Sequence, residues 1–172
     1  MESEIEIDGD HLTIKETMDV ARHFRRVVLN PAAHEKMKVC EENVSKLVEK
    51  GEPIYGINTG YGPFRDKTIS KEKVEELQVN LIRSHSVGTG DPFPEEVVRA
   101  AMLIRANTIA KGYSGARPLV VNTLLEMLNK KVTPIVPEKG SVGASGDLAP
   151  LSHLALVLIG EGEAQYNGER MH

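Results

Sequence analysis

Apolar residues recur at intervals of three and four along most of the chain, which is the spacing of helices that bury one face. Thr13 and Glu16 have capping-box spacing and predict a first helix that runs to about Val28. The Asn-Pro pair at residues 30–31 ends it and begins a second helix, for which Gly51 supplies the terminal cap. The same spacing predicts further helices near residues 74–82, 97–109, 118–128 and 148–159. The pattern therefore indicates a mainly α fold.

Alternation of apolar and polar residues is confined to short stretches near the two ends. Ile5 and Ile7 alternate with acids, and Leu12 and Ile14 follow a Gly-Asp pair, so a short hairpin or paired extended ends are expected there. Residues 163–172 have the pattern of a strand, an Asn-Gly turn and the beginning of a returning strand. The sequence stops within that last strand, which is an odd place for a natural terminus.

Two glycine-rich stretches interrupt the helical pattern. Residues 52–70 carry Gly56, Gly60 and two prolines, and a long ordered loop of this kind usually has a functional role. Residues 140–150 form the second stretch and precede a helix that is apolar almost all round, which predicts that this helix is buried. Asp147 is placed to cap that helix, whose N-terminal dipole would then face the glycine-rich stretch.

Composition narrows the class of protein. The net charge is −4 and the 21 basic residues are interspersed with the 25 acidic ones. A surface that binds nucleic acid or an acidic membrane is therefore not expected, and a small-molecule substrate fits better. Cys40 is the single cysteine and lies on the apolar stripe of the second predicted helix, which indicates a small buried hydrophobe. The N-terminus lacks a leader pattern and no apolar run approaches the length of a membrane span. We expect a cytoplasmic protein, and the histidine spacing predicts no metal site.

The tripeptide Ala144-Ser145-Gly146 carries a distinctive chemical possibility. Gly146 has no Cβ, so the backbone can fold back until its amide nitrogen reaches the carbonyl carbon of Ala144 and closes a five-membered ring with loss of water. Loss of a second water from the Ser145 hydroxyl leaves an exocyclic methylidene, an electron sink that other enzymes usually import as a cofactor. The tripeptide alone is equally typical of a glycine-rich loop before a helix, or of an anion cradle. No Gly-Lys-Ser/Thr follows, which argues against a Walker-type phosphate loop.

Three blocks of sequence carry a family resemblance. They are residues 55–62 (YGINTGYG), 80–88 (NLIRSHSVG) and 140–153 (GSVGASGDLAPLSH). In this order they resemble the aromatic amino acid ammonia-lyase family. The resemblance implies that Ala144-Ser145-Gly146 becomes 4-methylidene-imidazol-5-one (MIO), with no external cofactor. It also implies that residues 1–172 are the N-terminal segment of a longer enzyme, whose C-terminal helical bundle is absent, and that the fold is the N-terminal helical part of the ammonia-lyase fold.

The resemblance implies a role for Tyr55, which matches the family's catalytic base and would remove the β-proton of the substrate. An ordinary phenol is a poor base at neutral pH, so this role needs surroundings, or substrate binding, that favour the deprotonated form. On sequence alone an amphipathic tyrosine that covers the core explains the same residue.

His85 and Ser84 match the positions that meet the substrate side chain in the family. Their polarity resembles the members that act on histidine, whereas phenylalanine-selective members tend to carry apolar residues there. His85 also lies on the apolar face of its predicted helix, where a structural histidine is common, and His153 is expected to be structural too. Arg65, Arg83 and Arg117 are expected to be structural, because the family's arginine for the substrate carboxylate belongs to the absent portion.

The resemblance therefore implies non-oxidative deamination of L-histidine to trans-urocanate and ammonia by a homotetramer whose active sites combine several subunits, so that residues 1–172 alone are inactive. One alternative is a tyrosine or phenylalanine lyase or an aromatic 2,3-aminomutase, which would use the same ring and base on another side chain. The other alternative is a catalytically inactive helical interaction module that keeps the glycine-rich loop for packing.

Overall fold

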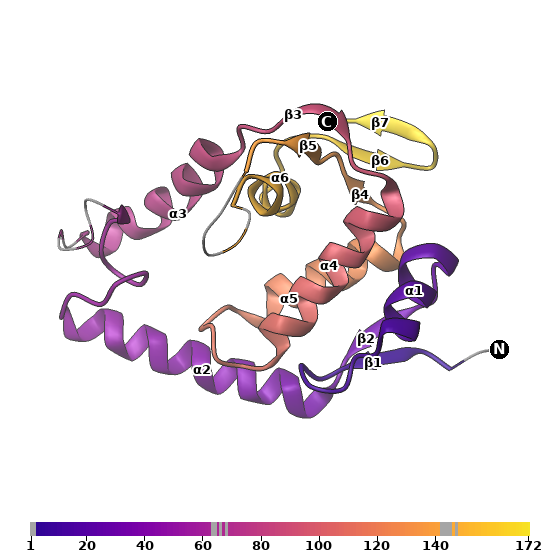
Figure 1. Cartoon of the computed structure of the whole chain (residues 1–172). Coiled ribbons are helices and arrows are strands. Elements are labelled where there is room, and N and C mark those ends of the chain that lie inside the picture. Colours follow the sequence, from indigo (N-terminus) through magenta and orange to yellow (C-terminus); the bar gives the residue numbers. More distant parts are fainter. Residues whose placement is uncertain (1–2, 63–64, 66, 68, 142–145, 147) are drawn as a thin grey trace.

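The protein is mainly helical in a computed structural model that describes residues 3–62, 65, 67, 69–141, 146 and 148–172 (Figure 1). The helices are α1 (Ile14–His23), α2 (Pro31–Lys50), α3 (Lys71–His85), α4 (Glu95–Ala110), α5 (Pro118–Asn129) and α6 (Leu148–Leu158). The strands are β1 (Ile5–Ile7), β2 (Val27–Leu29), β3 (Thr89–Pro92), β4 (Thr133–Pro134), β5 (Pro137–Lys139), β6 (Ala164–Tyr166) and β7 (Glu169–Met171). The expected fold class is confirmed.

The N-terminal region differs in part from the prediction. Thr13 accepts a hydrogen bond from the Glu16 amide at 3.2 Å and donates its own amide to the Glu16 carboxylate at 2.9 Å, so the capping box is confirmed. The predicted continuation of this helix to Val28 is wrong, because α1 ends at Phe24 in a left-handed conformation with φ 55°. The chain then forms β2, which pairs in parallel with β1. The predicted N-terminal hairpin is therefore also wrong, and Ile14 begins α1 with 83% of its surface exposed.

The hydrophobic core lies around α4 and α5, which run side by side through the centre of the molecule (Figure 1). Helix α1 packs against one side of α4, and the β1–β2 pair contributes apolar residues to the same core. The most deeply buried large side chains are apolar apart from Arg99 and Thr59, and they include Ile7, Met37, Met102, Leu103, Leu124 and Leu128. The core thus comes from aliphatic and Met side chains, as expected for a chain without tryptophan.

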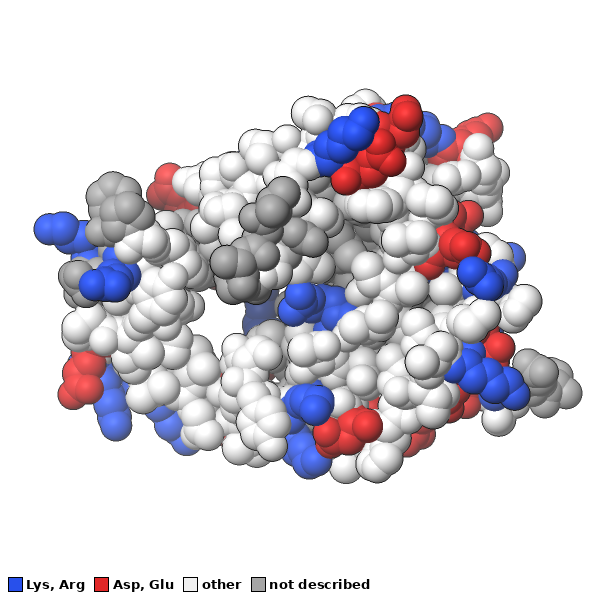
Figure 2. Space-filling view, in the orientation of Figure 1, with Lys and Arg blue, Asp and Glu red and all other residues white. Residues whose placement is uncertain are grey.

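Helices α2 and α3 extend from this core as an arm. Only Ala33 and Met37, both in the first two turns of α2, are buried, and Cys40 is half-buried rather than buried as predicted. Gly51 caps the helix at φ 73°, which confirms the predicted end. Figure 2 shows an opening between this arm and the central helices, on a face where basic and acidic side chains are interspersed.

Helix α6 packs against α3 and lies beside the short strands (Figure 1). Strand β3 pairs antiparallel with β5, and β4, β6 and β7 form a second antiparallel sheet. Asn167 and Gly168, with φ 52° and 81°, form the tight turn between β6 and β7, so the C-terminal hairpin is confirmed. Complete burial of α6 was a wrong prediction, because 54% of Leu148 is exposed and most of the helix is only half-buried.

Candidate functional site

The segment between α2 and α3 holds Tyr55 and is braced by one buried side chain. Asn58, only 3% exposed, accepts a hydrogen bond from the Ile54 amide at 2.8 Å and donates to the Glu52 carbonyl at 2.8 Å. The Ile57 amide donates to the Ile54 carbonyl at 3.0 Å, which closes a turn around Tyr55. These bonds hold the backbone on both sides of Tyr55 and leave its side chain 63% exposed. Tyr55 therefore does not cover the core.

Tyr55 is connected to α3 through a second tyrosine. The rings of Tyr55 and Tyr61 meet edge to face with their centroids 6.0 Å apart. The Tyr61 hydroxyl lies 3.1 Å from the Gln78 side-chain nitrogen, which donates to it. Gln78 lies in the middle of α3, and His85 lies two turns further along the same helix.

Ser84 and His85 occupy the C-terminal end of α3. The Ser84 hydroxyl donates to the Leu81 carbonyl at 3.0 Å, and the His85 Nδ1 lies 2.9 Å from the same carbonyl oxygen. A hydrogen bond from Nδ1 to this carbonyl places the ring proton on Nδ1, and the neutral ring then presents Nε2 as an acceptor. The Ser84 hydroxyl also lies 3.0 Å from Nδ1. His85 is half-buried, and Ser84 is exposed.

The glycine-rich stretch approaches this end of α3 through a contact between two glycines. A Cβ placed on Gly140 would lie 2.7 Å from the Gly88 Cα, closer than real Cβ atoms come, so only glycine permits this approach. Beyond it, Gly146 has φ 118°, which L side chains rarely adopt. Ala144, Ser145 and the predicted helix cap Asp147 lie outside the described residues.

The structure brings together some of the predicted site residues and separates another. Ser84 and His85 lie at the end of α3 where β5 and α6 meet it (Figure 1). The segment that carries Tyr55 lies at the opposite end of α3. Tyr55 contacts Tyr61, which contacts α3 at Gln78, two turns or roughly 10 Å before His85 along the helix axis.

The sequence pattern assigned no supporting role to two residues of this region, Asn58 and Gln78, although Asn58 lies in the same block of resemblance as Tyr55. The expectation that His153 is structural is confirmed by its contact with the backbone at Gly88, but its partner lies 65 residues away and no local signal identifies it.

Arg83, another candidate residue, has a partner in the structure. Arg83 forms an ion pair with Glu161, which lowers the pKa of the Glu161 carboxyl, so its predicted structural role is confirmed. Within the described residues, no group of three or more metal-ligating side chains comes together. Among the same residues, no helix combines the length and apolarity that crossing a membrane requires.

Comparison with known proteins places the chain in a family whose members of known structure share this mainly helical fold. The family model for aromatic amino acid lyases matches residues 12–172, and the chain belongs to this family. A histidine ammonia-lyase of Caldanaerobacter subterraneus subsp. tengcongensis is 58% identical over 165 residues, which are 96% of this chain and 32% of the relative. The chain thus spans about a third of the length of the curated relatives it matches.

Solved structures share the fold. A tyrosine aminomutase from Streptomyces globisporus superposes with a TM-score of 0.91 at 40% identity, over 98% of this chain and 32% of that one. A histidine ammonia-lyase from Trypanosoma cruzi gives a TM-score of 0.87 at 34% identity, with the same coverage of both chains. The fold and the family are therefore shared by enzymes that differ in substrate and product.

Proposed function

We propose that this chain forms part of an enzyme that converts L-histidine to trans-urocanate and ammonia. The observation that carries the proposal is the orientation of the His85 ring, whose Nδ1 lies 2.9 Å from the Leu81 carbonyl oxygen. The remaining ring nitrogen, Nε2, is then an acceptor at the end of α3. An acceptor there suits the N–H of a substrate imidazole, whereas the ring of phenylalanine offers no such donor. Curated relatives named histidine ammonia-lyase, 54–58% identical, support the same substrate.

Tyr55 is the proposed acceptor of the substrate β-proton. Its exposed side chain is available to a substrate, while the two hydrogen bonds of Asn58 hold the turn that carries it. A base of this kind contributes through position as well as basicity, because the proton must lie within hydrogen-bond reach of the phenol oxygen. Tyr61 limits the freedom of the Tyr55 ring on one side.

Ala144, Ser145 and Gly146 are the proposed source of the MIO group. The positive φ of Gly146 and the empty space where its Cβ would lie fit a backbone that folds back on itself at this position. When formed, the group supplies an electron sink that the ordinary side chains lack. The residues of this chain bind the substrate side chain at His85 and accept the β-proton at the phenolate oxygen of deprotonated Tyr55, which becomes a phenol.

The active enzyme is proposed to be a cytoplasmic homotetramer in which different copies supply Tyr55 and the tripeptide to one site. The segment that carries Tyr55 lies at the other end of α3 from the β5–α6 contacts of the same chain, which supports this arrangement. For the same reason, residues 1–172 alone are expected to release no ammonia from histidine.

Mixing two inactive variants of the complete enzyme tests this shared site. Tyr55→Phe and Ser145→Ala subunits should each be inactive alone, while co-expressed subunits should regain about a quarter of the wild-type sites through random assembly. A mixture that stays inactive, from variants that demonstrably assemble together, would place each site within one chain.

Mass and product identity test the activity itself. The intact mass of the complete protein should be short by two waters, and Ser145→Ala should restore the full mass and abolish turnover. Release of urocanate identifies a histidine lyase, whereas a β-amino acid from tyrosine identifies an aminomutase, the second candidate, which the structural match to a tyrosine aminomutase favours. A full mass together with no turnover of any aromatic amino acid would leave the interaction-module alternative.

A further inference from the structure

A histidine on α6 contacts the backbone that follows α3. The Gly88 amide donates a hydrogen bond to the His153 Nε2 at 2.9 Å. The approach is close, because a Cβ on Gly88 would lie 3.0 Å from Nε2 and 3.1 Å from the Pro137 Cβ. Gly88 therefore lies between His153 on α6 and Pro137 at the start of β5.

The same glycine also contacts the entrance to the glycine-rich stretch. Gly140 is so close to Gly88 that no side chain fits between their backbones, and Thr89 pairs with Lys139 in the β3–β5 ladder. His85 stands three positions before Gly88 in the chain. The hydrogen bond thus joins the end of α3, which carries His85, to the helix that leads out of the glycine-rich stretch, and the Gly88–Gly140 contact joins it to the segment that leads in.

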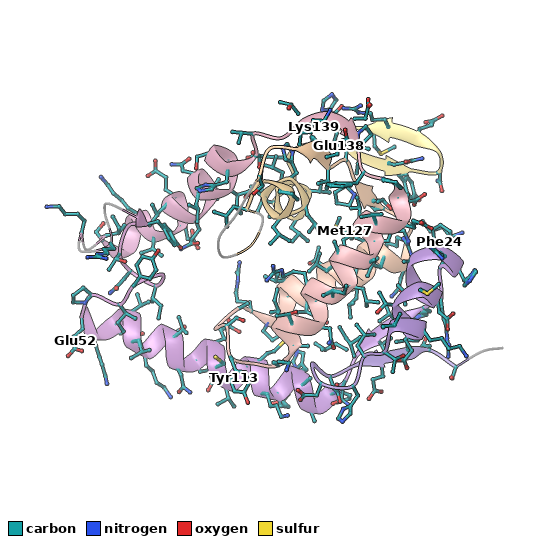
Figure 3. All side chains as sticks on the ribbon, in the orientation of Figure 1. Phe24, Glu52, Tyr113, Met127, Glu138 and Lys139 are labelled. Carbon is teal, nitrogen blue, oxygen red and sulfur yellow. The ribbon has the colours of Figure 1, made fainter. Side chains whose placement is uncertain are left out.

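The contact sets the protonation of His153. Since Nε2 accepts the Gly88 amide proton, the ring must be neutral with its own proton on Nδ1. Burial lowers the pKa of His153, which favours this neutral form at neutral pH. Two ion pairs lie on the elements around it, Arg83 of α3 with Glu161 and Lys139 of β5 with Glu138 (Figure 3 labels the second pair). Lys73, Glu75, Glu76 and His85 of α3 and Asp91 of β3 are the other titratable groups on these elements whose side chains are described.

We infer that His153 is a positioning residue, which holds the end of α3 at the glycine-rich stretch by accepting the Gly88 amide proton and thereby places His85 for the substrate. The inference rests on the proposed function for the role of His85. The hydrogen bond of His153 is to the backbone of Gly88 and acts through it, so His153 is not assigned a step in the chemistry.

Two substitutions in the complete enzyme separate this role from simple packing. His153→Leu keeps apolar volume and removes the acceptor, whereas His153→Gln keeps an acceptor near the position of Nε2. His23→Leu is the matched control, because His23 is exposed on α1. If His153→Leu does not fold, His153→Asn takes its place, since the shorter amide cannot reach the Gly88 nitrogen.

Activity should fall in the variant that lacks the hydrogen-bond acceptor and not in the variant that keeps one. His153→Leu should lower kcat/KM for histidine at least about tenfold, chiefly through KM, because small displacements of a binding group are costly. Hydrogen exchange at Gly88, measured by mass spectrometry on peptides spanning residues 84–90, should become about tenfold faster. His153→Gln should stay within about threefold of wild type in both measurements, and His23→Leu within about twofold. The mass deficit of two waters should persist in all three variants.

Several outcomes would overturn the inference. Wild-type kinetics and exchange in His153→Leu would show that the hydrogen bond positions nothing, and equal damage in His153→Gln would show that shape rather than the acceptor matters. Loss of the two-water deficit in His153→Leu would move the defect to ring closure. A wild-type enzyme that releases no ammonia overturns the proposed function and, with it, the catalytic role of His153.

Discussion

Arg99 provides the strongest test of how this fold is held together. Its side chain is fully buried on α4, and its guanidinium donates to the carbonyls of Val20 at 2.9 Å, Ala21 at 3.2 Å and Leu128 at 3.2 Å. These carbonyls belong to the last turns of α1 and α5, where backbone acceptors lack intrahelical donors and the helix dipole is negative. The guanidinium also lies 4.3 Å from the centre of the Phe24 ring, where α1 ends (Figure 3 labels Phe24).

The cost of removing this cation follows from those contacts. Hydrogen bonds to a charged group contribute about 1.5–3 kcal/mol each, and Arg99 makes three of them. Burying the guanidinium opposes this gain, and the same desolvation lowers the pKa of Arg99, although an arginine stays protonated. We expect Arg99→Leu to reduce the free energy of unfolding by about 3–5 kcal/mol, because it leaves buried carbonyls without donors. A loss of that size is a large fraction of the stability of an ordinary domain.

Urea unfolding followed by circular dichroism measures the difference, with the linear slope compared between variants to confirm a common transition. Arg22→Leu is the control, because Arg22 forms an exposed ion pair with Glu96 at 2.8 Å and such pairs contribute at most about 1 kcal/mol. The loss of unfolding free energy for Arg99→Lys should lie between those of Arg99→Leu and Arg22→Leu, since an ammonium cannot present a planar fork to three carbonyls. Losses that agree within about 0.5 kcal/mol for Arg99→Leu and Arg22→Leu would refute this account of the core.

Three further predictions concern the site. Asn58→Ala should cost about 2 kcal/mol in the free energy of unfolding and abolish most turnover, because it frees the turn around Tyr55; thermal melts and ammonia release measure the two effects. Gly140→Ala should cost about 2–3 kcal/mol by the same melts, since its Cβ would collide with Gly88, and an unchanged melting temperature would contradict that close approach. The lowered pKa of His153 means that the unfolded chain takes up the proton first as the pH falls below about 6.5, so stability should decline there. His153→Gln should flatten that part of the pH profile, and an identical profile in both proteins would refute the assignment.

Features set by neighbouring residues were predictable from the sequence. The capping box at Thr13, the left-handed cap at Gly51 and the tight turn at Asn167 each depend on a few adjacent residues, and all three are confirmed. The Glu126–Lys130 pair, one helical turn apart, also forms, with the charged atoms 3.0 Å apart. Local chemistry is sufficient in these cases because each motif satisfies its own backbone groups.

Features set by distant residues were not predictable. Val28 fits the spacing of α1, but pairing of residues 27–29 with Ile5–Ile7 overrides helix propensity at that point. Arg99 fits a solvent-exposed charge by sequence and is instead the largest buried side chain, because three carbonyls from other helices surround it. The contacts of the candidate site were unpredictable for the same reason, because the residues that contact Gly88 lie on β5 and α6, far from it in the sequence.

The wrong prediction about α6 and the separation of Tyr55 have one common explanation. Helix α6 is apolar almost all round, yet in this chain only Ala149 and Leu154 are buried on it. Burying apolar surface releases about 25 cal/mol per Å², so a helix of this composition gains stability when further protein covers its exposed side. In the proposed tetramer, further protein would cover the exposed side of α6, and Tyr55 of one copy would meet the tripeptide of another. If that proposal holds, the exposed apolar surface of α6 in the single chain is a subunit contact.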